Sequence, residues 1–206
     1  MGSVFLDLDG TLVNSQGRLY RLFRKLCPEC HMSYDEYWTV KRTRISQAAL
    51  LKKFFRYDDD RIRTFHKDWL DQVEDEVAVE TDSPVEGVSG RLSRLAQKHD
   101  LFLLTARQKT ELVVRQIAKF GWNGLFRRLI VTRQACDKSQ AVKDARLPVD
   151  GGVLIGDTGE DVLAARQLGM KSVAVGWGIL SPEVLREYNP DYLAERMEDL
   201  DNCPFI

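Results

Sequence analysis

The chain begins with a short apolar run that leads directly into two carboxylates. The run covers residues 3–6, and the pentapeptide DLDGT, which contains Asp7 and Asp9, follows it. A short apolar run that ends near a glycine is typical of a buried β-strand. Side chains alternate along a strand, so Asp7 and Asp9 are predicted to point the same way at its carboxyl end. Two like charges this close are costly unless a cation or a dedicated chemistry uses them.

Four further apolar runs are separated from one another by helical patterns. The runs lie at residues 101–104, 129–131, 153–155 and 172–175. Strands that alternate with helices predict a mostly parallel sheet with helices on both faces. We therefore expect an α/β fold with a Rossmann-like parallel sheet as its core.

Residues 15–80 interrupt this alternation, because they carry helical patterns and no convincing strand. The insert leaves from the turn that bears the two carboxylates, and open α/β sheets bind ligands at the carboxyl ends of their strands. We therefore predict a helical cap at residues 15–83 and an α/β hydrolase core formed by residues 1–14 and 84–206. The alternative is a helical layer packed beside the sheet.

Charge and composition restrict the partners that the chain could have. With a net charge of −1 at pH 7, the chain has no overall electrostatic attraction to nucleic acid or to a membrane surface. No apolar stretch reaches the roughly 18 residues that a membrane helix needs, and the amino terminus shows no basic leader before a long apolar region. We expect a cytoplasmic protein that binds neither nucleic acid nor membranes. Cys27 and Cys30 are interpreted as reduced thiols, with metal or redox use as the alternative.

Polar residues follow three of the predicted strands at the point where each strand ends. Thr105, Ala106 and Arg107 follow the second strand, Lys138 opens the helix after the third, and residues 156–161 follow the fourth. Because the carboxyl ends of parallel strands meet at one edge of a sheet, we expect these residues to converge on the acidic pair. Clustered carboxylate oxygens suit a hard cation such as Mg²⁺.

These segments resemble the haloacid dehalogenase-like (HAD) hydrolase superfamily, and most closely its phosphoglycolate-phosphatase-like branch. The resemblance rests on D-x-D-G-T at residues 7–11 and G-D-T-x-x-D at residues 156–161, with Thr105 and Lys138 between them. It covers most of the predicted core. The insert matches only in place, size and helical character.

The resemblance implies phosphoryl transfer through Asp7. Asp7 would attack phosphorus and form an aspartyl-phosphate, and Asp9 would act first as general acid and then as general base. Mg²⁺ would be held by the Asp7 carboxylate, the Asp9 main-chain carbonyl and Asp157, and would let two anions approach each other. Asp161 would orient Lys138 or a water at the metal. The alternative for Asp161 is that it only caps its helix.

The resemblance also implies which residues bind the substrate. Thr105 and neighbouring backbone N–H groups, such as that of Ala106, would bind phosphoryl oxygens, and Lys138 would offset charge on the nucleophile and the transferring group. The branch often has a Lys-Pro pair at this point and this chain does not, so Lys143 is the alternative lysine. Arg107 is either a ligand of the substrate phosphate or a solvated residue.

The insert carries one dense basic run, KRTR at residues 41–44. Arg42 and Arg44 of this run are candidates for holding an anionic group of the substrate. The alternative is a solvated helix turn, which is what most charge runs form.

Together these features predict a Mg²⁺-dependent phosphatase that hydrolyses a small-molecule phosphomonoester. Two other functions are kept as alternatives: a phosphomutase-type phosphotransferase that acts on a sugar phosphate, and a non-catalytic phospho-binding module. The sequence determines neither the substrate nor the oligomeric state.

Overall fold

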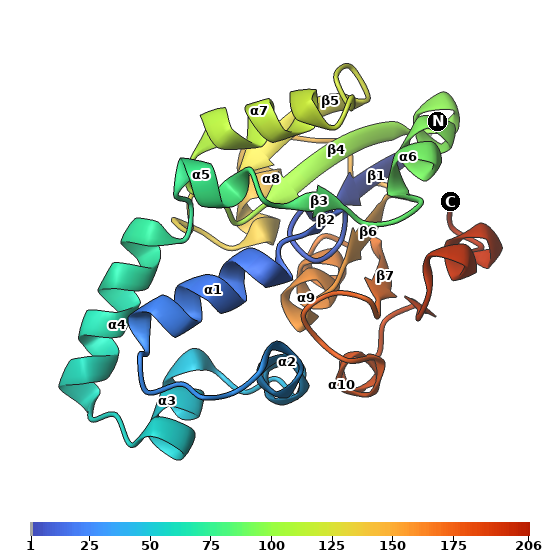
Figure 1. Ribbon diagram of the computed structural model, residues 1–206. Helices are drawn as coiled ribbons and strands as arrows, with labels where there is room; N and C mark the ends of the chain where they lie inside the picture. The colour runs from blue at the N-terminus through green and yellow to red at the C-terminus, as the bar shows by residue number, and fades with distance from the viewer. Residues whose placement is uncertain (1) are drawn as a thin grey trace.

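A six-stranded sheet forms the centre of the computed structural model, which describes residues 2–206 (Figure 1). Its strand order is β5-β4-β1-β6-β7-β8, and every neighbouring pair is parallel. The chain moves from β1 first to one side and then to the other, so the topology reverses beside β1. The strands are β1 (Ser3–Leu6), β4 (Asp100–Thr105), β5 (Phe126–Val131), β6 (Val153–Gly156), β7 (Lys171–Val175) and β8 (Tyr192–Ala194).

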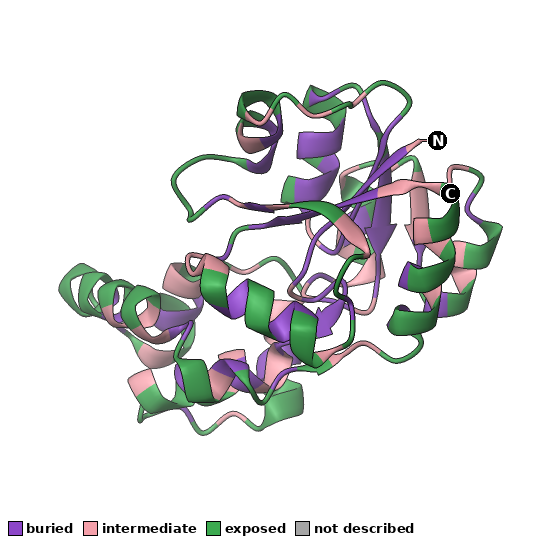
Figure 2. Cartoon of the chain, turned by 90° about the horizontal axis from the view of Figure 1, so that it is seen from above, coloured by how far each residue is buried: buried purple, intermediate pink, exposed green. Residues whose placement is uncertain are grey.

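Helices cover both faces of the sheet, because side chains of one strand alternate between two apolar layers. Val4 and Leu6 pack with the helices of one face, whereas Phe5 packs with those of the other and stacks on Phe102 at a centroid distance of 4.8 Å. Figure 2 shows the strands buried between the two helical layers. One face carries α6 (Val88–Lys98), α7 (Thr110–Lys119) and the 3₁₀ helix η1 (Met197–Asn202); the other carries α8 (Lys138–Asp144), α9 (Gly159–Gln167) and α10 (Pro182–Glu187).

The helical insert lies between two short antiparallel strands, β2 (Val13–Asn14) and β3 (Ser83–Pro84). It has an apolar core of its own, built around Phe23, Tyr37 and Phe65. Figure 1 shows its longer helices grouped at one end of the sheet. The helices are α1 (Gln16–Leu26), α2 (Tyr34–Lys41), α3 (Gln47–Phe55), α4 (Asp59–Gln72) and α5 (Glu76–Val79). That residues 15–83 act as a cap, separate from the core, stays a prediction.

The expected α/β sheet is confirmed, and the differences concern short elements. Strands β2, β3 and β8 were not predicted, because two or three residues are too few for a periodic pattern to be detected. The apolar spacing of Val85, Val88, Leu92 and Leu95 predicts a helix from Val85, but the helix that follows the insert begins at Val88. Val85 instead donates its N–H to the Leu12 carbonyl at 2.9 Å, and Gly87 adopts a φ of +77°, which no helix accommodates.

No helix within residues 2–206 has both the length and the apolar character that are needed to cross a bilayer.

Asp191 ties the segment before β8 to β7 and gives the fold a pH-sensitive contact. Its carboxylate accepts hydrogen bonds from Lys171 Nζ at 2.7 Å, Ser172 N at 2.9 Å and Ser172 Oγ at 2.8 Å. Burial by itself would raise the pKa of Asp191, but these donors lower it to about 2. A depressed carboxyl pKa stabilises the fold at neutral pH, and this stabilisation is lost as the pH falls from about 4 toward 2.

We expect Asp191→Ala to lower the free energy of unfolding by about 1–2 kcal/mol at pH 7, and by less at pH 3, where the wild type has already lost part of this contribution. Urea unfolding at the two pH values measures the difference. Asp150→Ala, at an exposed turn position, is the control and should change little. An equal loss at both pH values would contradict the assignment.

Candidate active site

A cavity of about 200 Å³ opens at the carboxyl ends of β1, β4 and β6, next to the insert. Loops that follow parallel strands meet at this edge, so residues far apart in sequence share one wall. The core contributes Asp7, Asp9, Thr105, Ala106, Arg107, Lys138 and Asp157 to the lining, and the insert contributes Arg18, Leu19, Val73 and Glu74. The cavity is therefore shared between the two parts of the chain.

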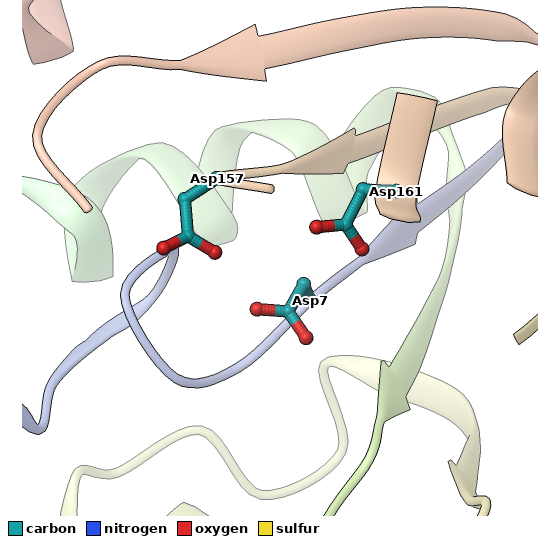
Figure 3. A group of neighbouring side chains, drawn as sticks. All are labelled: Asp7, Asp157 and Asp161. Atoms are coloured by element: carbon teal, nitrogen blue, oxygen red, sulfur yellow. The ribbon is translucent and has the colours of Figure 1, made fainter. Parts of the chain in front are cut away.

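Three aspartates face one another (Figure 3), and two of them, Asp7 and Asp157, line this cavity. Asp7 directly follows β1 and is held by its N–H, which donates to the Ile155 carbonyl at 2.9 Å. Asp157 follows β6, and Asp161 lies in the first turn of α9. Carboxylate oxygens of Asp7, Asp157 and Asp161 lie within 4.8 Å of one another.

Lys138 is the cation that offsets this acidic cluster. Its Nζ donates to Asp7 Oδ1 at 2.6 Å and to Asp161 Oδ1 at 2.5 Å. Asp137 caps α8 through the N–H of Gln140, so Lys138 is the first residue of the helix and its side chain turns toward the sheet edge. Three carboxylates thus face one ammonium group.

Two glycines allow the backbone to approach Asp157. Gly10 has a φ of +86°, and a side chain there or at Gly178 would overlap the Asp157 carboxylate. Thr11 Oγ1 lies between Asp7 Oδ2 at 3.2 Å and Asp157 Oδ1 at 3.3 Å. The glycine and threonine of the D-x-D-G-T motif therefore serve the geometry of the acidic cluster.

Burial and like charges dominate the electrostatics of the cluster. Burial raises the pKa of Asp7 to about 6, although Lys138 opposes this shift, and Asp161 adds to it. Burial and the Asp7 charge raise the pKa of Asp157 well above its usual range. Burial alone would lower the pKa of Lys138, but Asp161 and Asp7 raise it above its usual range, so the ammonium form is fixed.

Asp9 also lines the cavity but belongs to a separate ion-pair network. Arg107 contacts it in a bidentate manner, Nε to Oδ2 at 2.6 Å and Nη2 to Oδ1 at 2.7 Å, and Arg18 Nη2 lies 2.8 Å from Oδ1. Asp82 accepts from both arginines at 3.0–3.2 Å. Burial would raise the pKa of Asp9, but the Arg107 and Arg18 guanidinium groups hold it well below its usual range.

The end of β4 and the loop that follows it bring Thr105 and Ala106 to the cavity. Thr105 is buried, and its Oγ1 accepts the N–H of Arg107 at 3.3 Å. Glu74, from the insert, accepts the N–H groups of Gln108 at 2.5 Å and Lys109 at 2.9 Å. The insert therefore fixes the loop that would contact a phosphoryl group.

The structure brings most of the sequence-predicted residues together and resolves three alternatives about their placement. Lys138, and not the exposed Lys143, reaches the acidic cluster. Arg107 is buried, so the interpretation as a solvated residue is wrong. Asp161 both caps α9, through Thr158 N at 3.1 Å, and holds Lys138.

Arg42 and Arg44 are not brought to the cavity, contrary to the expectation that they hold an anionic group of the substrate. Arg42 Nη2 donates to the Gly176 carbonyl at 2.5 Å. Arg44 is exposed, lies over the Tyr188 ring at 4.8 Å and pairs with Glu187 at 3.8 Å. Both side chains are directed to the loop and helix that follow β7, because α2 packs there.

Three further residues belong to the site although the sequence did not predict them: Arg18, Glu74 and Asp82. Arg18 is one polar residue in an amphipathic helix, and Asp82 lies in a segment typical of a linker. Both are nearly fully buried, and only the tertiary structure pairs them with Arg107 and Asp9. The only available signal was a basic residue, Arg18, seven positions after the D-x-D-G-T motif.

The donor set of the cluster fits a hard divalent cation. Asp157 is completely buried, and with a single ammonium for three carboxylates its own charge is not balanced. Carboxylate and carbonyl oxygens are the ligands that Mg²⁺ prefers. Asp7, Asp157 and the Asp9 main-chain carbonyl could hold the ion, while Asp161 is already engaged by Lys138. Cys27 and Cys30 lie elsewhere, buried as free thiols in the insert.

Comparison with known proteins extends over nearly the whole chain. The pyrophosphatase PpaX of Halalkalibacterium halodurans is 23% identical over 220 residues, covering 97% of this chain and 95% of the relative. A HAD-like hydrolase from Streptococcus pneumoniae superposes with a TM-score of 0.79 at 21% identity, covering 98% of each chain. A predicted phosphoglycolate phosphatase from Haemophilus somnus superposes with a TM-score of 0.69 at 19% identity, covering 98% of this chain and 97% of that one. At these identities the solved structures establish the fold.

The family follows from a match of the family model for haloacid dehalogenase-like hydrolases to residues 4–175. That range includes both aspartate motifs, Thr105 and Lys138, as well as the insert. The predictions that the chain belongs to this family and that it is a hydrolase are therefore confirmed. The chain belongs to the haloacid dehalogenase-like hydrolases.

Proposed function

We propose that the chain is a Mg²⁺-dependent phosphatase that hydrolyses a small phosphomonoester through an aspartyl-phosphate on Asp7. The observation that carries the proposal is the position of the Asp7 carboxylate. It lies in the wall of the cavity, 2.6 Å from the Lys138 ammonium and beside Asp157, with Asp9 in the same cavity. This arrangement offers a nucleophile, a charge-balancing cation and a second carboxyl group for proton transfer.

The reaction takes two displacements at phosphorus. In the first, Asp7 Oδ forms a bond to phosphorus while the bond to the leaving oxygen breaks, and Asp9 supplies the proton to that oxygen. In the second, water attacks the phosphorus of the aspartyl-phosphate, Asp9 takes the proton of the water, and the Asp7 carboxylate and inorganic phosphate are released. When bound, the divalent cation reduces the repulsion between the anionic nucleophile and the anionic ester.

Asp9 needs both of its protonation states in this scheme. The two guanidinium groups that contact it favour the carboxylate, which is the form that acts as the base in the second step. Protonation for the first step requires that Arg18 or Arg107 releases Asp9. Anionic oxygens of an entering ester are suitable alternative partners for these guanidinium groups.

Small substrates with two anionic groups fit the cavity best. A volume of about 200 Å³ can hold a small ester, and Arg18 and Arg107 supply positive charge beside the nucleophile. The names of two similar proteins, a pyrophosphatase and a predicted phosphoglycolate phosphatase, point to substrates of this class. Thr105 Oγ1 and the N–H of Ala106 are the groups that we assign to the transferring phosphoryl.

A phosphate-release assay tests the proposal with pyrophosphate, phosphoglycolate, hexose phosphates and nucleoside monophosphates, each with Mg²⁺ and with a chelator. We expect Mg²⁺-dependent release from at least one small, doubly anionic compound and none with the chelator. No release from any compound, or release that the chelator does not affect, would contradict the proposal.

Lys138→Ala is expected to lower kcat by about 10²–10³-fold, because the ammonium group balances charge on Asp7 and the transferring phosphoryl. The matched control is Lys143→Ala, which removes an exposed ammonium of the same helix and should retain activity. Steady-state kinetics on the best compound of the panel measures both variants. Similar losses in the two variants would contradict the role of Lys138.

A further inference from the structure

The loop at residues 176–181, which follows β7, is the element that fixes Asp157. The Ile179 N–H donates to Asp157 Oδ2 at 2.6 Å, and Gly178 packs directly against the same carboxylate. Trp177 Nε1 donates to the Thr11 carbonyl at 3.1 Å, which ties the 176–181 loop to the turn after β1. The orientation of the Asp157 carboxylate therefore depends on the path of this loop.

The insert holds the 176–181 loop from its other side. Arg42 Nη2 donates to the carbonyls of Gly176 at 2.5 Å and Leu180 at 3.5 Å, and the Arg42 carbonyl accepts the Ser181 N–H at 3.1 Å. Gln16 Nε2, from the first turn of α1, donates to the Gly178 carbonyl at 3.0 Å. Backbone groups along the loop are thus bonded by two residues of the insert.

Packing adds to these hydrogen bonds. The Ile179 side chain packs against the apolar core of the insert, while its N–H holds Asp157. A shift of α2 would therefore move the same residue that orients the carboxylate. Because Asp157 is completely buried and its other oxygen contacts Thr11, its carboxylate has no alternative partner in solvent.

We propose that Arg42 is a positioning residue for the divalent cation: it holds the 176–181 loop so that Ile179 keeps Asp157 aimed at the cation site. This inference rests on the proposed function, since it assumes a cation between Asp7 and Asp157. The insert would then contribute to cation binding as well as to the lining of the cavity, because the cation affinity of the core would depend on a contact made by Arg42, at the end of α2. Groups that orient metal ligands typically contribute 10–100-fold to metal affinity.

Isothermal titration calorimetry with MgCl₂, on substrate-free full-length protein, measures this coupling. We expect Arg42→Ala to raise the Mg²⁺ dissociation constant about 10–100-fold, and saturating Mg²⁺ to restore most of the lost kcat. Arg42→Lys keeps one donor for the Gly176 carbonyl and should show an intermediate dissociation constant. Arg63→Ala, which removes an exposed arginine of α4, is the matched control and should bind Mg²⁺ like the wild type.

Gln16→Ala provides a second measurement, because it removes the contact to the Gly178 carbonyl while Arg42 stays in place. It also removes the hydrogen bond that Gln16 Oε1 accepts from the Tyr34 hydroxyl. We expect Gln16→Ala also to raise the Mg²⁺ dissociation constant. If Arg42→Ala does not fold, the dissociation constants of Gln16→Ala and Arg42→Lys test the inference. Unchanged dissociation constants in the folded Arg42 and Gln16 variants would overturn the inference and leave the proposed function intact. A wild-type protein that does not bind Mg²⁺ would overturn both.

Discussion

Asp7→Asn is expected to lower kcat for phosphate ester hydrolysis by about 10⁴-fold or more, because the amide cannot form the covalent intermediate. Asp7 lies between Lys138 and Thr11, and the amide that replaces it is nearly isosteric, so the cavity should keep its shape. The substitution also removes a buried charge from a group whose pKa is raised by burial. We therefore expect the variant to be folded and at least as stable as the wild type in the absence of metal.

The measurement is kcat on the best compound of the phosphate-release panel, with thermal unfolding as the test of folding. Asp71→Asn, on the exposed side of α4, is the control for an aspartate substitution that leaves the site untouched. Mass spectrometry of the purified variant verifies that the asparagine has not deamidated. Turnover above about one hundredth of the wild-type rate would exclude Asp7 as the nucleophile.

Loss of the cation site is expected to have the next largest effect. Asp157→Ala removes a completely buried carboxylate of the cluster, and we expect kcat to fall by about 10³-fold. We expect a similar fall in kcat when the wild-type protein is treated with a chelator. Added Mg²⁺ should restore the chelated wild type and not the variant. Asp150→Ala is the control. Full activity of Asp157→Ala at micromolar Mg²⁺ would contradict the assignment of this residue to the cation.

The same site gives the cation affinity a pH dependence of defined sign. Burial raises the pKa of Asp7 to about 6 and raises that of Asp157 above its usual range. Both groups hold protons at acid pH, and a cation must displace these protons. Mg²⁺ binding should therefore become tighter as the pH rises between about 5 and 8, with proton release on binding.

The sheet and the acidic cluster could be predicted from the sequence because their signals are local. Each apolar run produced a strand, and the rule that parallel strands end at one edge predicted that Asp7, Lys138 and Asp157 would converge. The insert helix α2 and the edge strand β8 could not be predicted, since their patterns are short. They are stabilised by tertiary packing.

The Asp9 network shows why the rest of the site could not be predicted. Arg18 comes from the first helix of the insert, Asp82 from its last segment, and Arg107 from the loop after β4. No sequence spacing relates these three positions, and each residue type is common on protein surfaces. The same holds for Arg42, whose guanidinium group bonds to main-chain carbonyls that carry no sequence signature.

A crystal structure of the protein with Mg²⁺ and beryllofluoride would show whether Asp7 is the nucleophile. Beryllofluoride mimics a phosphoryl group on a carboxylate, and we expect beryllium bonded to an Asp7 oxygen. The same structure should show Mg²⁺ in contact with Asp7 and Asp157. Beryllofluoride bonded to another carboxylate, or a cavity that contains neither group, would contradict the claim.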